Sequence, residues 1–247
     1  MKKILDFKNN FHLIKSKKVN IINKKSKNFD KIFLELKKDL KNKKKTLNVL
    51  DNNFSFNFKI SELKRFQKFK TIAIVGMGGS ILGSEAIYSF LDNKIKKRIY
   101  FFNNLNENEI LNLKKKQKNF SKILFIIISK SGNTIETLSN IFSLNILKKN
   151  SKNIIIISKK NNFLFNLAKR LNLLHIEHNN FIGGRYSVLS ETGIIPSYLM
   201  GVNIHNLRSK LLDFLKIDKL FLKESSIQLS NFLITAKYNN LIFLNYH

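Results

Sequence analysis

The chain has 247 residues, a formal net charge of +29 at pH 7 and a mean hydropathy of −0.17. It contains no cysteine, which excludes disulfides, thiolate nucleophiles and cysteine metal sites. No apolar stretch approaches the roughly 20 residues of a membrane-spanning helix, so we expect a soluble globular protein that does not enter a membrane.

The net charge alone would fit a nucleic-acid-binding protein, because lysine and arginine release counterions from phosphate backbones. However, Lys, Asn, Ile and Phe are enriched together, whereas Pro occurs once and Trp not at all. The four enriched residues have A/T-rich codons, so nucleotide bias explains the lysines and the phenylalanines alike. We therefore favour solvated lysine surfaces and expect no nucleic-acid partner.

Residues 1–50 are predicted to form a helical N-terminal segment. Apolar side chains recur there at helical spacing, as at Phe29, Ile32, Phe33, Leu36 and Leu40. The basic start is followed by no sustained apolar core and no small-residue cleavage site, so we expect no signal peptide and a cytoplasmic location. An irregular connection is expected at LDNNFSFNF, residues 50–58.

Residues 51–202 alternate short apolar runs with stretches of helix length. The runs, rich in β-branched residues, are TIAIVG, RIYFFN, ILFIIIS, NIIIIS and LLHIEH. Helices are predicted between them, at 80–92, 106–117, 134–149 and 162–171. Strands that are apolar on both faces and alternate with helices indicate a parallel sheet covered on both sides. This region is thus predicted to be an α/β domain, with three αβα layers and a five-stranded parallel sheet.

Residues 203–247 are predicted to contain two linking helices, at 203–217 and 221–237, followed by a buried strand, LIFLNYH, at 241–247. A core strand of a parallel sheet is normally followed by a covering crossover. We therefore expect these residues to be the start of a second, similar domain and the chain to be an incomplete fragment.

The first unusual segment is GMGGSILG, residues 76–83, which directly follows the first apolar run. Ligands of parallel sheets bind at the carboxyl ends of strands. Gly78 and Gly79 allow the backbone to approach a ligand, and a helix starting near Ser80 offers N–H groups to an anion. The spacing matches neither a dinucleotide fingerprint nor a P-loop, and a tight turn without a ligand is the alternative.

The second segment, SKSGNTIETL at residues 129–138, follows the third apolar run. Asn133 and Glu136 are spaced to form a capping box for the next helix. Four polar side chains are surplus to such a cap: Ser129, Lys130, Ser131 and Thr134. Several short donors at a helix N-terminus suit a phosphate monoester, so we favour a phosphate site here.

The third segment is GGRYS, residues 183–187. Two glycines let the backbone around Arg185 come close to a ligand. The guanidinium fork suits a carboxylate, a phosphate or a developing oxyanion, although a structural ion pair would explain a single arginine equally well.

Taken together and in this order, the three segments resemble the glucose-6-phosphate isomerase family, whose domains are of the sugar-isomerase kind. That family carries a GIGGSxLG-like turn, an SKxxxTxET loop and a GGR[FY]S segment, which correspond to GMGGSILG, SKSGNTIETL and GGRYS here. The SxSGxT element occurs in sugar-isomerase domains generally, whereas GGRYS and the order of the segments point to the isomerase.

The resemblance implies an aldose–ketose isomerase of glycolysis and gluconeogenesis. It would interconvert glucose 6-phosphate and fructose 6-phosphate through a cis-enediolate, without cofactor or metal, as a homodimer when full length. Arg185 would be the catalytic residue that stabilises the enediolate. The implied substrate-binding residues are Gly78, Gly79, Ser80, Ser129, Lys130, Ser131, Thr134 and Gly184.

The sequence departs from the family in its general base. The family uses a glutamate in an ESxGK-like segment, followed by a histidine and a late lysine, and we find none of these here. Glu136 and Glu191, and the histidines of this chain, are interpreted as ordinary core or surface residues. We expect the chain alone to be inactive. A non-catalytic phosphosugar-binding module and another sugar-phosphate isomerase of the same domain family remain as alternatives.

Overall fold

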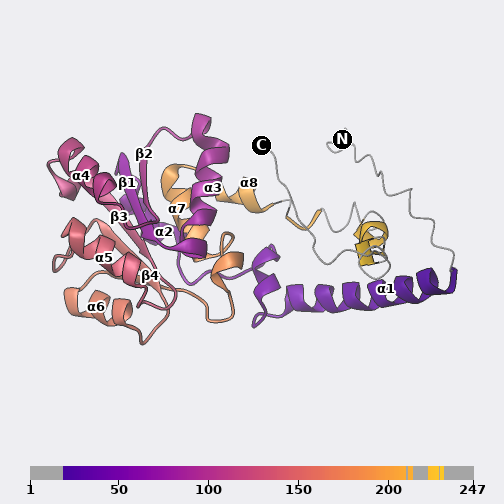
Figure 1. Ribbon diagram of the computed structural model, residues 1–247. Coiled ribbons are helices and arrows are strands. Elements are labelled where there is room, and N and C mark those ends of the chain that lie inside the picture. The colour runs from indigo at the N-terminus through magenta and orange to yellow at the C-terminus, as the bar shows by residue number, and fades with distance from the viewer. Residues whose placement is uncertain (1–18, 210, 214–221, 228, 231–247) are drawn as a thin grey trace. The chain divides into compact units, whose positions relative to one another are not determined.

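The computed structural model describes residues 19–209, 211–213, 222–227 and 229–230 (Figure 1). It divides into a larger unit, Asp39–Leu212, and a smaller unit made of Met1–Lys38 and Asp213–His247. No helix among the described residues is long and apolar enough to cross a membrane. The predicted strand at 241–247 and most of the predicted helix at 221–237 lie outside the described residues.

The first helix, α1 (Val19–Lys41), begins in the smaller unit and ends in the larger one. Its aromatic residues lie one turn apart, so the rings of Phe29 and Phe33 stack with centroids 5.6 Å apart. In the same unit Lys223 Nζ lies 2.8 Å from a carboxylate oxygen of Asp30. The helical spacing noted in the sequence is therefore realised in α1.

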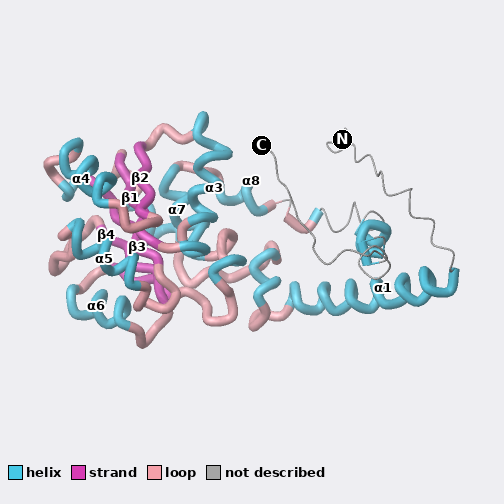
Figure 2. Tube along the Cα trace, viewed as in Figure 1, coloured by secondary structure: helices cyan, strands magenta, loops and turns pink. Residues whose placement is uncertain are grey.

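A single five-stranded sheet is formed by the described strands of the larger unit (Figure 2). All neighbouring strands pair in parallel, in the order β2-β1-β3-β4-β5. The strands are β1 (Thr71–Gly76), β2 (Arg98–Phe102), β3 (Ile123–Ile128), β4 (Ile154–Ser158) and β5 (Leu174–Glu177). The predicted parallel sheet is confirmed.

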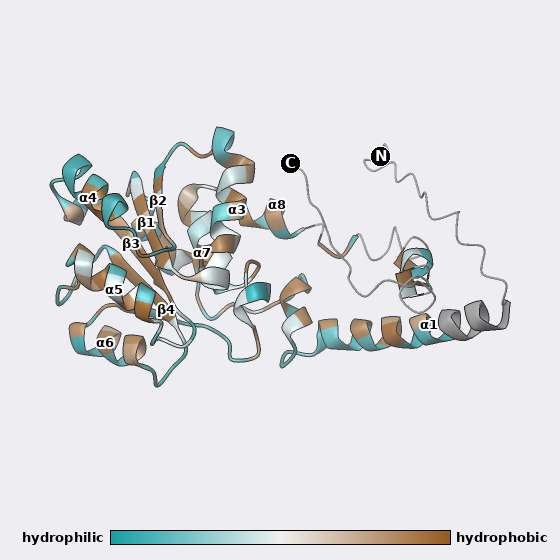
Figure 3. Ribbon diagram, in the orientation of Figure 1, coloured by the Kyte–Doolittle hydropathy of each residue, from teal (hydrophilic) through white to brown (hydrophobic). Residues whose placement is uncertain are grey.

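Helices cover both faces of this sheet and complete the three layers. One face packs against α2 (Ile60–Leu63), α3 (Leu82–Leu91) and α7 (Glu191–Met200). The other packs against α4 (Glu107–Lys116), α5 (Ile135–Leu144) and α6 (Phe163–Leu171). Figure 3 shows the hydrophobic strands between helices whose outer faces are more polar.

The two cores draw on alternate residues of β1, β2, β3 and β4, because successive side chains in a strand point to opposite faces. In β1, for example, Ile72 and Ile74 belong to one core, whereas Ala73 and Val75 belong to the other. Both sets are fully buried. This is why the strands appear in the sequence as continuous apolar runs rather than alternating ones.

The order of strands changes direction at β1. The chain moves from β1 to the edge strand β2 through α3, and then returns past β1 to β3. Because α3 and α5 lie on opposite faces, the segments after β1 and β3 separate at the carboxyl ends of these strands. Such a switch point is where open α/β sheets bind ligands.

Three helix boundaries differ from the prediction. The 3₁₀ turn η4 (Gly78–Ser80) precedes α3, so the helix starts at Leu82. Helix α5 ends at Leu144 instead of 149, because Asn145 adopts a left-handed conformation with φ of 51°. The helix predicted at 203–217 is represented by α8 (Ile204–Arg208) among the described residues.

Candidate functional site

The candidate site lies at the switch point between β1 and β3. The last residues of these strands, Gly76 and Ile128, are partners in the parallel register. GMGGSILG therefore leaves β1 beside the point where SKSGNTIETL leaves β3. Pairing of the two strands brings together segments that are about fifty residues apart in the sequence.

Three hydroxyl groups form a cluster after β3, which we call the hydroxyl triad (Ser129, Ser131 and Thr134). Ser129 Oγ lies 3.0 Å from Thr134 Oγ1, and Ser131 Oγ lies 3.3 Å from the same atom. The two serine hydroxyls are 3.5 Å apart. Ser129 is buried and Ser131 is exposed, so the triad reaches from the end of the strand to the surface.

The predicted capping box of Asn133 and Glu136 is wrong. Thr134 occupies the N-cap position of α5, and its side chain makes no capping hydrogen bond because its hydroxyl contacts the two serines. Among the residues that the structure describes, no side chain therefore caps the N–H groups of the first turn of α5. The positive end of the helix dipole is left available to an anion beside the triad.

Gly132 is required by the tight turn inside this segment. Its φ is +74°, and an added Cβ would collide with the side-chain amide of Asn162. The Gly132 N–H donates to Ser129 Oγ at 3.1 Å. The backbone thus fixes the position of the buried member of the triad.

The first and third segments touch each other through their glycines. A Cβ on Gly79 would collide with the carbonyl group of Gly184, so the turn η4 packs directly on the turn η7 (Gly184–Tyr186). Ser187 Oγ lies 3.2 Å from the Gly79 oxygen and 2.7 Å from the Gly184 oxygen. Contact this close between backbones is possible only without side chains.

Lys130 joins the second segment to the third. Its Nζ donates to the backbone oxygens of Asn180 at 2.8 Å and Ile182 at 2.6 Å, just before GGRYS. Burial, and next the charge of Lys159, lower the pKa of Lys130. Its ammonium is engaged with the loop in this structure, so the role of Lys130 in phosphate binding stays a prediction.

Arg185 lies exposed in η7, one residue after Gly184. In the part of the chain that the structure describes, its guanidinium makes no hydrogen bond or ion pair with another residue. The described residues thus provide no acidic partner for Arg185, which argues against the alternative of a structural ion pair. Gly78 and Ser80 are partly exposed in η4.

A buried His–Glu pair underlies the GGRYS loop, and our sequence reasoning missed it. His178 Nδ1 lies 3.5 Å from Glu191 Oε2, and both side chains are almost wholly inaccessible. His178 Nε2 is 3.2 Å from the Ile182 oxygen, and the Asn57 N–H donates to Glu191 Oε1 at 3.3 Å. The pair contacts the loop from its buried side. No motif or spacing in the sequence indicated that these two residues would meet.

The comparison with protein families decides the assignment. Residues 18–245 match the family model described as "Phosphoglucose isomerase". The chain belongs to the phosphoglucose isomerase family. The family predicted from the three segments is confirmed.

Curated relatives of the phosphoglucose isomerase family are similar over about half to two thirds of this chain. A "Probable glucose-6-phosphate isomerase" of Methanococcus maripaludis is 34% identical over 171 residues, which are 65% of this chain and 38% of that protein. A "Glucose-6-phosphate isomerase" of Borreliella afzelii is 38% identical over 144 residues, which are 52% of this chain and 26% of that protein. The chain thus spans less than half the length of these relatives.

Two solved structures share the fold of this phosphoglucose isomerase family member. A hypothetical protein from Thermus thermophilus matches with a TM-score of 0.63 and 21% identity, covering 86% of this chain and 54% of that one. A glucose-6-phosphate isomerase from Chlamydia trachomatis matches with a TM-score of 0.51 and 21% identity, covering 70% and 36% respectively.

Proposed function

We propose that this chain provides the sugar-phosphate-binding part of an enzyme that interconverts glucose 6-phosphate and fructose 6-phosphate. One observation carries the proposal. The three family segments meet at the switch point of the sheet, where the hydroxyl triad lies at the uncapped start of α5. Family membership supports the same substrate class.

In this proposal the phosphate binds to the hydroxyl triad and to the first-turn N–H groups of α5. Short hydroxyl donors and a helix N-terminus both stabilise a compact dianion. Gly78, Gly79 and Ser80 bring the η4 backbone against the sugar. Lys130 contributes by holding the loop before GGRYS, through its two carbonyl contacts.

The sugar carbons are proposed to lie toward Gly184 and Arg185. Aldose and ketose interconvert by moving a proton between C1 and C2, and negative charge develops on the oxygens of the enediolate in between. A guanidinium that has no partner among the described residues can stabilise that charge without first breaking an ion pair. This assigns the catalytic role to Arg185.

The general base and the ring-opening groups are proposed to come from residues outside these 247. Glu191 is unsuited to the role because its side chain is buried against His178. Positioned general acid–base catalysis contributes about 10²–10⁴-fold in rate, so we expect binding with negligible turnover. The cytoplasmic location and the homodimer are proposals for the whole protein.

The test measures binding and turnover separately. Isothermal titration of glucose 6-phosphate, 6-phosphogluconate and glucose should give heats of binding for the two phosphorylated ligands alone. Ser131→Ala and Thr134→Val should each weaken binding about 10-fold, the loss of one or two hydrogen bonds to a charged group. Ser143→Ala, on the exposed face of α5, is the matched control and should bind like the parent chain.

Two outcomes would contradict the proposal. Equal affinity for glucose and glucose 6-phosphate would show that the chain has no binding site for the phosphate group. Rapid production of fructose 6-phosphate by the 247-residue chain, followed in a coupled assay, would place the general base among its own residues.

A further inference from the structure

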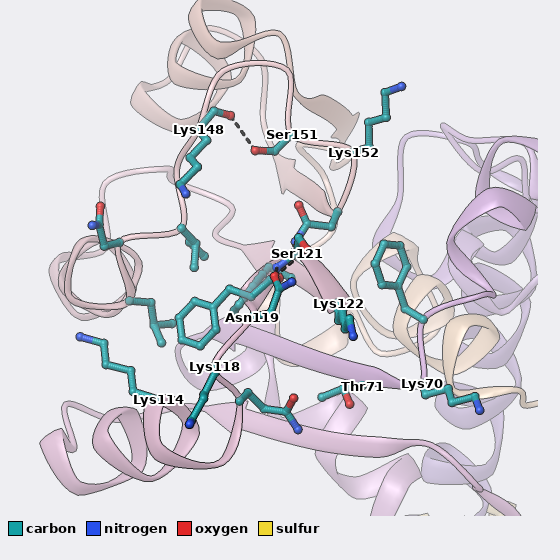
Figure 4. Close-up of a pocket in the computed structure, with 18 of the residues that line it drawn as sticks. Lys70, Thr71, Lys114, Lys118, Asn119, Ser121, Lys122, Lys148, Ser151 and Lys152 are labelled. Carbon is teal, nitrogen blue, oxygen red and sulfur yellow. Dashed lines mark hydrogen bonds between the residues drawn. The ribbon is translucent and has the colours of Figure 1, made fainter.

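A cavity of about 1190 Å³ lies at the opposite end of the sheet from the candidate site (Figure 4). Its walls include Thr71 at the start of β1, residues 117–122 before β3 and residues 151–153 before β4. Leu144 and Asn145, at the end of α5, complete one side. The cavity thus lies at the amino ends of the strands, where no family segment falls.

The cavity is lined by one sign of charge. Seven of its nineteen lining residues are lysines and none is acidic. Six of them are labelled in Figure 4: Lys70, Lys114, Lys118, Lys122, Lys148 and Lys152. None of these lysines forms an ion pair with a described residue. Their charges therefore add up in one concave space, which focuses a positive potential.

The general abundance of lysine does not account for this concentration. The whole chain has 45 Lys+Arg and 16 Asp+Glu in 247 residues, so nineteen average residues would include about three basic and one acidic. Favourable interaction of lysines with the C-terminal ends of helix dipoles also does not explain why so many lysines line the cavity. Lys114 is the single lysine of the cavity in the last turn of a described α-helix, whereas the others lie outside α-helices.

The basic surface continues beyond the cavity. A neighbouring depression of about 500 Å³ shares Lys70 and Thr71 and adds Lys96, Lys97 and Arg98. Burial lowers the pKa of Lys97, so its charged form lacks full solvation. We call the two depressions together the amino-end surface. It is rich in cationic side chains, and no carboxylate lies among the described residues that line it.

The aromatic residues of the amino-end surface do not suit the bases of a nucleic acid. Phe69 and Phe125 are buried, and Phe120 is partly buried with its ring 5.7 Å from that of Phe125. Binding of single strands needs exposed aromatic faces on which bases stack. The surface therefore offers ammonium groups for phosphates and no platform for bases.

We propose that the amino-end surface binds a phosphoanhydride chain, as found in inorganic polyphosphate and in nucleoside triphosphates. Such a chain presents closely spaced negative charges to the lysines and releases counterions on binding. The occupant would be held by charge-assisted hydrogen bonds from several ammonium groups. This site is separate from the proposed sugar-phosphate site and does not depend on it.

The test is titration of the 247-residue chain with tripolyphosphate at about 50 to about 200 mM salt. The variant Lys118→Gln/Lys122→Gln/Lys148→Gln removes three lysines from the cavity. Its control, Lys41→Gln/Lys43→Gln/Lys44→Gln, removes three exposed lysines that line neither depression, with the same change in net charge. We expect at least a 10-fold loss of affinity in the first variant, a salt slope shallower by about 2–3, and less than a 2-fold change in the control.

Further ligands distinguish the source of the phosphate chain. Equal affinity for ATP and tripolyphosphate would support a site for the anhydride chain alone, and much tighter binding of ATP would support a nucleoside triphosphate. Similar losses in both triple variants, or tighter binding of a single-stranded oligonucleotide of equal charge, would overturn the proposal. Circular dichroism of each variant checks that it folds, and Lys118→Gln alone repeats the test with a milder change.

Discussion

Arg185 and Arg208 occupy opposite environments. Arg208 is buried and donates to the backbone oxygens of three residues, Val49, Asp51 and Leu189. Its guanidinium also lies over the rings of Phe54 and Phe56. Arg185 is exposed and has no such partner within the described residues. The difference separates an arginine that holds the fold from one that is available to a ligand.

The substitution Arg185→Gln should therefore affect binding and spare stability. The affinity for 6-phosphogluconate, whose carboxylate resembles the charge of an enediolate, should fall about 10- to 100-fold, as for loss of a hydrogen bond to a charged group. The free energy of unfolding should change by less than about 0.5 kcal/mol. Titration calorimetry and urea unfolding give the two quantities. An unchanged affinity for 6-phosphogluconate would show that Arg185 does not contact the ligand.

Arg208→Gln should show the reverse pattern. It removes donors from three buried or partly buried carbonyl groups, so the free energy of unfolding should decrease by about 2–4 kcal/mol. In urea denaturation the midpoint should shift to lower concentration. Sugar-phosphate affinity, measured on the folded fraction, should stay near that of the parent chain. A stability loss below about 0.5 kcal/mol would show that these contacts are dispensable.

At the scale of elements, the glycine contact between η4 and η7 is a specific requirement of the site. In Gly79→Ala the new Cβ would meet the backbone of Gly184, so the two turns must move apart. We expect lower affinity for 6-phosphogluconate, by about 10-fold or more, because a misplaced binding group loses its hydrogen bonds.

Gly201→Ala is the matched control for this change. Gly201, at the end of α7, has φ of +100° with no atom near the added Cβ, so alanine there brings backbone strain of about 1–2 kcal/mol and no collision. It should destabilise the protein while leaving the turns in contact. If both variants lost affinity equally, the loss of stability rather than the contact of the turns would explain the weaker binding.

The sequence was informative about elements wherever a pattern is local. The strands β1, β3 and β4 were predictable because they are buried on both faces and read as continuous apolar runs. The edge strands β2 and β5 are only partly buried, but their runs are still largely apolar. The end of α5 was not predictable, since it depends on the left-handed conformation of one asparagine, Asn145. The capping box failed for a related reason, because the hydroxyl of Thr134 contacts serines instead of the helix backbone.

The sequence motifs of the candidate site were predictable, whereas the long-range contacts that hold these motifs in place were not. The three segments could be assigned to strand ends from spacing alone. In contrast, the Lys130–Ile182 hydrogen bond joins residues 52 positions apart, and the His178–Glu191 pair forms only when β5 meets α7. Such contacts depend on the packing of the whole sheet, which no local pattern encodes.

At the scale of the whole molecule, we expect His175 to make the stability of the fold depend on pH. Its Nε2 lies 2.9 Å from Ser158 Oγ, and its ring packs against Phe165. Burial lowers the pKa of His175 from its ordinary value of 6.5, opposed by the backbone of Ser158 and by Glu177, and reinforced by Lys160. The folded state therefore favours neutral imidazole, and the unfolded state binds a proton first as the pH falls.

Stability should accordingly be highest above pH 6.5 and should decrease as the pH falls through 6.5 toward the lower pKa of the folded state. In His175→Gln the free energy of unfolding should vary less over this window, as measured by urea denaturation at several pH values. His205→Gln, which replaces an exposed histidine, should keep the pH profile of the parent chain. Identical profiles for all three proteins would contradict this role of His175.

The hydrogen bond from Ser187 to the Gly79 oxygen joins residues 108 positions apart. During synthesis, η4 emerges from the ribosome long before the turn that covers it. At about 5–20 residues per second, the interval is about 5–20 s. Well before the interval ends, β3 has been made and can pair with β1, yet the glycines of η4 still have no partner. The nascent chain thus contains the hydroxyl triad, which we propose binds phosphate, before it contains Arg185.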